Sequence, residues 1–254
     1  MIYFKNKKNL DTFLMVFILG AVKAYRRNYI DLTILEYYIF SMSIRLMCRK
    51  VHLSAKLLNI IGDGMSLEDV DEWMARRIPI PALNDTLDDI EYSSWIALIE
   101  RELEGDTLSE ALKISTHDEN KLGIYFFTDY VEEIFWALFL LGLYEVLQKP
   151  EFISESIISC IKQSYLSEIY TCERIQDEDF QACISNLQEI SDTNISGQLS
   201  KDLITMKAKL ASLQVLLPFY GMSSDKLETG IDLKATKGMF WQIKVSGKFI
   251  DLGL

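Results

Sequence analysis

Two apolar stretches without a charged residue, Thr12–Val22 and Ile134–Tyr144, constrain the fold of this chain more than any other feature. Each stretch has 11 residues, whereas a helix needs about 20 to cross a bilayer. The basic segment before the first stretch gives it the layout of a signal peptide, which is one alternative. Because the apolar pattern continues to Tyr25 and Tyr29, we interpret both stretches as central helices of a soluble core.

Helical signals dominate from residue 9 to about residue 217. Asp11, Asp31 and Ser54 are the N-cap residues expected for the first three helices. Gly62 is the expected end of the third helix. The expected helices cover residues 11–27, 32–47, 55–61, 86–103 and 129–148. A further helix is expected after Ser66, broken by the prolines of the segment 78–81, with a short one after Thr107 and three more between residues 154 and 217.

Two regions have the pattern of strands instead. Residues 122–127 could form a short strand before Thr128, which is expected to cap the helix of the second apolar stretch. Near the C-terminus the apolar residues alternate in short segments separated by turn residues, which predicts a small antiparallel β-meander over residues 231–252. Its three segments are 231–234, 239–245 and 248–252.

The polar stretch 114–123 is the expected boundary between two domains. We therefore expect a mainly α fold of two packed helical lobes. The first is an N-terminal helical domain, residues 1–113. The second is a C-terminal helical domain, residues 118–254, which ends in the β-meander.

A duplicated helical hairpin is one interpretation of the two lobes. The longer of two sequence matches aligns Phe13, Phe17, Leu19 and Gly20, at the same spacing, with Phe135, Phe139, Leu141 and Gly142. A shorter match follows it along the chain and links residues 30–35 with residues 153–158. The alternative is that two unrelated core hairpins have converged on the same composition, since repeats are usually recognised from more than two copies.

Charge is unevenly distributed along the chain, whose formal net charge is −11. Residues 57–192 hold 29 Asp and Glu against 8 Lys and Arg, whereas residues 1–56 and 193–254 are basic. Such segregation creates a field of one sign, which attracts partners of the opposite sign. We therefore expect a basic protein as the partner. The overall negative charge argues against nucleic acid or a membrane surface.

No motif for nucleotide binding, hydrolysis or metal binding is present in the sequence. The chain lacks a P-loop, a dinucleotide-binding glycine turn, a G-x-S-x-G nucleophile and an H-E-x-x-H zinc motif. His52 and His117 are the only histidines, too few for a site built from several of them. We therefore assign no catalytic residue, metal ligand or cofactor. Four cysteines without C-x-x-C spacing are typical of reduced thiols in a cytoplasmic protein.

Clustered carboxylates are the most abundant chemical groups in the acidic middle of the chain. The candidate partner-binding residues are Glu68, Asp69, Asp71, Glu72, Asp85, Asp88 and Asp89. Glu68 and Glu72 are four residues apart, and like charges at this spacing destabilise a helix, so folding alone does not explain them. The alternatives are a solvated acidic surface and pairing with the basic residues of the chain itself.

Three groups of residues carry a family resemblance. They are FLMVFILGAVKA over residues 13–24, Ile30-Asp31 with Glu36 and Phe40-Ser41, and Gly64 with Leu67-Glu68-Asp69-Val70. With them, residues 10–90 resemble a family of small bacterial helical proteins known only as a domain of unknown function. The resemblance implies a compact helical domain of bacterial origin, and no catalytic residue comes with it.

These observations predict an immunity-type protein, a cytoplasmic acidic inhibitor that binds and blocks a cognate bacterial toxin domain. Its carboxylates would occupy the basic cleft in which the toxin binds an anionic substrate. The alternative is a helical adaptor or scaffold subunit of a bacterial complex, for instance in phage defence. An enzyme with an unfamiliar carboxylate site is a third class, and it has the least support from the sequence.

Overall fold

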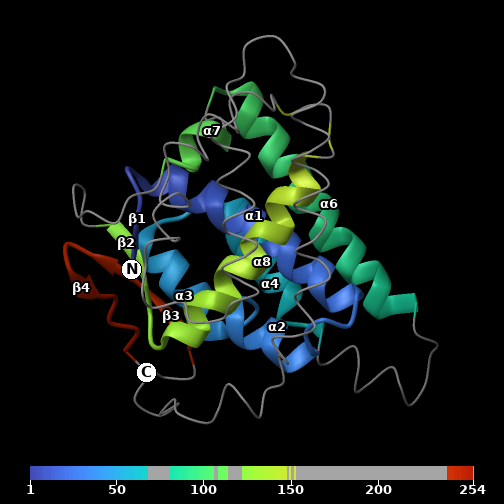
Figure 1. Ribbon diagram of the computed structural model, residues 1–254, viewed down its shortest axis with the longest axis horizontal. Coiled ribbons are helices and arrows are strands. Elements are labelled where there is room, and N and C mark those ends of the chain that lie inside the picture. Colours follow the sequence, from blue (N-terminus) through green and yellow to red (C-terminus); the bar gives the residue numbers. More distant parts are fainter. Residues whose placement is uncertain are drawn as a thin grey trace.

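The computed structural model describes residues 1–67, 81–105, 108–113, 122–147, 149, 152 and 239–253. Helices make up most of this part, and a small antiparallel sheet lies at one side of them (Figure 1), as the sequence predicts. The helices are α1 (Lys7–Arg26), α2 (Leu32–Tyr38), α3 (Met42–Val51), α4 (Ala55–Gly64), α6 (Pro81–Leu103), α7 (Leu108–Ala111) and α8 (Asp129–Leu147). The strands are β1 (Ile2–Tyr3), β2 (Leu122–Phe126), β3 (Trp241–Val245) and β4 (Lys248–Phe249).

Helix α1 is the central element of the fold. Every residue from Asn9 to Val22 is buried, so the first apolar stretch is a core helix, as expected. The expected start at Asp11 is wrong, because the Asn6 side chain caps the helix by accepting a hydrogen bond from the Asn9 amide at 2.9 Å. Asp11 therefore lies inside the helix and is 1% exposed.

Two of the other expected N-caps are confirmed. Oxygen atoms of Asp31 and Ser54 accept hydrogen bonds from the backbone amides three residues later, at 2.8 and 3.2 Å. The expected single helix over 32–47 is two helices, because Ser41 caps α3 in the same way.

Two expected helix boundaries are also wrong. Helix α4 continues past Gly62 to Gly64, and α6 begins at Pro81 instead of Thr86. Proline suits the first position of a helix, where its missing N–H group would have no partner in any case.

Helices α1 and α8 cross one another (Figure 1). A glycine on each helix lies at the point of close contact. A methyl group on Gly20 would overlap the carbonyl oxygen of Leu138, and one on Gly142 would overlap that of Val16. Two glycines therefore allow the backbones to touch where larger residues would hold them apart.

The contacts between these helices repeat in a two-fold pattern. Phe13 stacks on Phe139 with ring centroids 4.1 Å apart, and Phe17 stacks on Phe135 at 4.0 Å. These are the residues that the proposed duplication makes equivalent. In the strands before the helices, Ile2 of β1 pairs with Ile124 of β2.

A second sequence match accompanies this pairing. Residues 2–4 and 124–126 are both Ile-Tyr-Phe, and they have the same spacing to Gly20 and Gly142. Residues 153–158, which would extend the comparison, lie outside the described residues. The duplication therefore stays a hypothesis, now with matching contacts as well as matching residues.

The four strands form one antiparallel sheet in the order β1-β2-β3-β4. The expected C-terminal hairpin is confirmed, with Ser246 and Gly247 at φ of 53° and 75° in its turn, the conformation that a tight hairpin requires. The expected strand at 231–234 lies outside the described residues.

The sheet joins segments that are distant in the sequence. Strand β2 is confirmed, and Thr128 caps α8 by accepting a hydrogen bond from the Val131 amide at 3.2 Å. The sequence does not predict that β1, from the first residues, pairs with β2 across the expected domain boundary. That boundary, between residues 113 and 118, stays a prediction because residues 114–121 lie outside the described part.

The sheet is attached to the helices by aromatic side chains. The Trp241 indole N–H of β3 donates a hydrogen bond to the Tyr38 carbonyl of α2 at 2.7 Å, and the Trp241 ring packs against Phe135. Within the described ranges, no helix is both long and apolar enough to cross a membrane.

Candidate functional site

The structure places three of the candidate partner-binding residues. Asp85, Asp88 and Asp89 lie on the N-terminal half of α6, and all three are exposed. The remaining four candidates, Glu68, Asp69, Asp71 and Glu72, lie outside the described residues.

Part of this negative charge is paired with basic residues at the end of α1. Arg26 forms an ion pair with Asp88. Lys23 Nζ lies 2.8 Å from a carboxylate oxygen of Glu91, and Arg27 pairs with Glu145 of α8 at 3.0 Å. The alternative that the chain neutralises its own acidic residues therefore holds for Asp88 and Glu91.

Asp85 and Asp89 differ from Asp88 in this respect. Among the described residues, neither carboxylate has a hydrogen bond or an ion pair. The same is true of the exposed carboxylate of Asp63, near the end of α4. These three carboxylates are therefore exposed to solvent without a partner in the described part.

A groove with a volume of about 270 Å³ runs between α4 and α6. It is lined by Lys56, Asn59, Ile60, Asp63, Tyr92, Ser93, Ile96 and Ala97. At one end Lys56 forms an ion pair with Glu100, and Asp63 lies toward Tyr92 at the other, so the two helices run antiparallel. The end of α4 that carries Asp63 therefore lies beside the acidic half of α6.

Tyr92 is the residue that analysis of the sequence missed. Its side chain is 67% exposed, and exposed tyrosines are enriched where proteins bind one another. We call Asp63, Asp85, Asp89, Tyr92 and the groove the α4–α6 face. The buried residues of α6 recur at helical spacing as Leu87, Ile90, Ser94, Ala97 and Leu98, and Tyr92 lies off that stripe.

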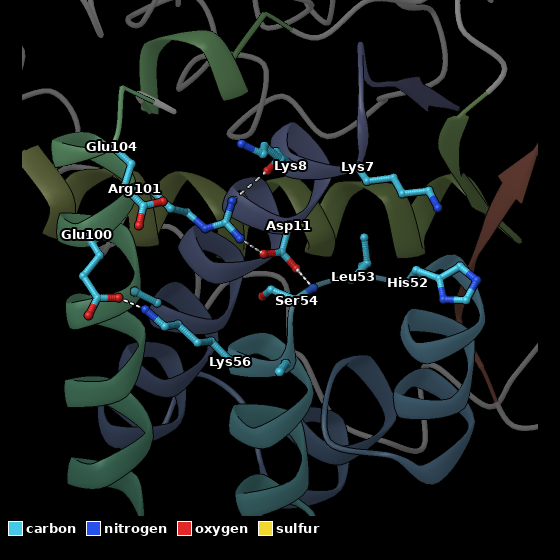
Figure 2. Close-up of a pocket in the computed structure, with 12 residues that line it drawn as sticks. Lys7, Lys8, Asp11, His52, Leu53, Ser54, Lys56, Glu100, Arg101 and Glu104 are labelled. Atoms are coloured by element: carbon cyan, nitrogen blue, oxygen red, sulfur yellow. Dashed lines mark hydrogen bonds and ion pairs between the residues drawn. The ribbon is translucent and has the colours of Figure 1, made fainter.

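A larger cavity, of about 480 Å³, lies where α1, α4 and α6 meet (Figure 2). At its floor Asp11 accepts a hydrogen bond from the Ser54 amide at 3.0 Å and forms an ion pair with Arg101. Arg101 also donates to the Thr12 hydroxyl at 3.3 Å. This network joins three helices through one buried carboxylate.

Burial raises the pKa of Asp11 above its ordinary value, because desolvation of the carboxylate outweighs attraction by Arg101 and the hydrogen bonds from Ser54. The polar groups at the floor of the cavity are therefore occupied with one another, and we assign them a structural role. Cys48 is buried nearby, and burial raises the pKa of its thiol, which leaves it unreactive. In the described ranges no three His, Cys, Asp or Glu residues are grouped to hold a metal ion.

The described part thus defines a mainly helical protein with a small antiparallel sheet and an exposed acidic face. Residues 5–110 match the model of a family described as a protein of unknown function, DUF3969. The match confirms the resemblance of the N-terminal third, and it includes the whole α4–α6 face. No curated protein and no solved structure matches the chain.

Proposed function

We propose that this chain is an immunity-type protein, which binds and blocks a basic toxin domain through the α4–α6 face. The observation that supports the proposal is the group of carboxylates on Asp63, Asp85 and Asp89. All three are exposed, as is Tyr92 on the same face, and no basic side chain of the described part pairs with the carboxylates.

The positions of Asp63 and Asp89 on their helices distinguish them from the acidic residues that stabilise a helix end. Negative residues are favoured in the first turn of a helix, where they interact with its positive end. Asp89 is nine positions into α6 counted from Pro81, and Asp63 lies near the C-terminal end of α4, where negative charge is unfavourable. Helix stability therefore does not account for these two carboxylates.

A rigid support makes the face suitable for inhibition. Helix α6 packs on α1 and α4, and the buried pair of Asp11 and Arg101 holds it to both. Carboxylates on a preorganised surface lose little entropy on binding. Placed in a basic cleft, they would exclude an anionic substrate by charge and by volume, and they would accelerate association.

The proposal predicts that Asp89→Lys slows association with the partner on the order of tenfold, because charges at an interface act mainly on the association rate. The partner is first isolated with the wild-type chain from its native host and identified by mass spectrometry. Association rates of the purified proteins are then measured at several salt concentrations. The variant should also show a weaker dependence on salt.

Glu104→Lys is the matched control, since it makes the same change in net charge at an exposed position beyond the other end of α6. Equal slowing by both variants would show that only the total charge affects association, and the α4–α6 face would then not be the binding surface. A partner without a basic surface, or a stable assembly of several subunits, would favour the adaptor alternative.

A further inference from the structure

We infer that the groove between α4 and α6 receives an arginine side chain of the partner, with its guanidinium group between Tyr92 and Asp63. The inference rests on the proposed function and names the anchor of the same interface. It follows from the shape of the groove, the apolar residues along it and the charges at its two ends.

The middle of the groove suits the aliphatic part of a long side chain. Ile60 of α4 and Ile96 and Ala97 of α6 line it, with Ile60 and Ala97 buried at its base and Ile96 partly exposed. A volume of about 270 Å³ admits one side chain and not a folded element. Long basic side chains bury their methylene groups along such apolar surfaces while the charged group stays at the rim.

The charges along the groove orient that side chain. Lys56 at one end is neutralised by Glu100, so neither attracts a further ion strongly. The carboxylate of Asp63 toward the other end has no partner in the described part, and Asp89 lies one helical turn from Tyr92 on α6. A cationic group is therefore expected to lie at the end that holds Asp63.

Arginine fits this end better than lysine does. Its planar guanidinium group can stack on an aromatic ring and donate two parallel hydrogen bonds to a carboxylate at the same time. The exposed ring of Tyr92 and the carboxylate of Asp63, which has no partner in the described part, both line the groove and offer those two interactions. A lysine ammonium group lacks the planar fork, so it can use the charge but not the geometry.

The test is a titration of the full chain, labelled at its isoleucine methyl groups, with the capped peptide Gly-Arg-Gly followed by NMR. The peptide should shift the Ile60 and Ile96 methyl signals with a dissociation constant in the millimolar range. Gly-citrulline-Gly, which has the same shape without the charge, should leave them unchanged. Tyr92→Leu and Asp63→Asn should each weaken the arginine peptide severalfold; both positions are exposed, so folding is preserved.

Equal shifts with citrulline, or no shift of either methyl group, would overturn the inference. Equal binding of Gly-Lys-Gly would overturn the choice of arginine. The two proposals can fail separately. If Asp89→Lys slows association with the isolated partner while Tyr92→Leu leaves both its affinity and the peptide titration unchanged, the acidic face is retained and the arginine anchor is wrong.

Discussion

Replacement of Gly142 by alanine is expected to lower the free energy of unfolding by about 3 kcal/mol, at the upper end of the range for overpacked cores. The added methyl group would overlap the carbonyl oxygen of Val16 in α1. A backbone atom in the middle of a buried helix cannot rotate away as a side chain does, so the two helices must separate. The higher helix propensity of alanine, about 1 kcal/mol, offsets only part of this cost.

Gly62→Ala is the matched control for this prediction. Gly62 is also inside a helix, but a methyl group there would approach only the flexible end of the Arg45 side chain. We expect its free energy of unfolding, measured by urea denaturation with circular dichroism, to stay within about 1 kcal/mol of the wild type. Equal effects of the two substitutions would contradict the close packing of α1 on α8.

Substitution of Asp11 by alanine should lower the free energy of unfolding by about 3–5 kcal/mol, the range observed when one member of a buried ion pair is removed. Arg101, whose side chain is only 13% exposed, would lose its ion-pair partner. The Ser54 amide at the start of α4 would lose its hydrogen-bond acceptor. Urea denaturation measures the loss, and a change below about 1 kcal/mol would show that water replaces the carboxylate.

The raised pKa of Asp11 gives this residue an unusual dependence on pH. Its folded-state pKa lies above the ordinary value of 3.8, so the folded chain binds this proton more tightly than the unfolded chain does. The resulting stability is complete below the unfolded-state pKa and is lost as the pH rises through the folded-state pKa.

Asp11→Asn supplies the comparison, because asparagine has nearly the same shape and does not titrate. The advantage of the wild type over this variant in free energy of unfolding should therefore increase as the pH falls from about 7 to about 4. A decrease over the same interval would mean that the attraction of Arg101 outweighs desolvation, with the opposite sign for the pKa shift.

Local features of the fold could be predicted from the sequence. Asp31, Ser54 and Thr128 each cap a helix by accepting a hydrogen bond from the backbone amide three positions later. All the information for such a contact lies within one helical turn. The turn of the C-terminal hairpin at Ser246 and Gly247 is local in the same sense.

Features that depend on distant residues could not be predicted. Asp11 has the residue type of an N-cap, and only its pairing with Arg101, 90 residues later, explains why it is buried inside a helix. The pairing of β1 with β2 joins residues more than 100 positions apart. A single sequence contains no direct signal for either contact.

The ion pairs of the acidic residues also depend on distant residues and could not be predicted. Asp85, Asp88 and Asp89 form one cluster in the sequence, but Arg26 pairs with Asp88 and leaves the other two free of ion pairs among the described residues. The charge count locates the acidic segment and cannot show which members are neutralised. Tyr92 could have been found from the helical spacing of α6, since the buried stripe leaves it on the opposite side.

Site-specific photo-crosslinking of the purified complex tests the central claim most directly. A benzophenone amino acid replaces Tyr92 in one variant and Phe249 in another; both are exposed aromatic residues, and Phe249 lies on β4, away from α6. The account predicts that the partner is cross-linked from position 92, through a basic segment of its surface, and not from position 249. Cross-linking from position 249 alone would contradict it.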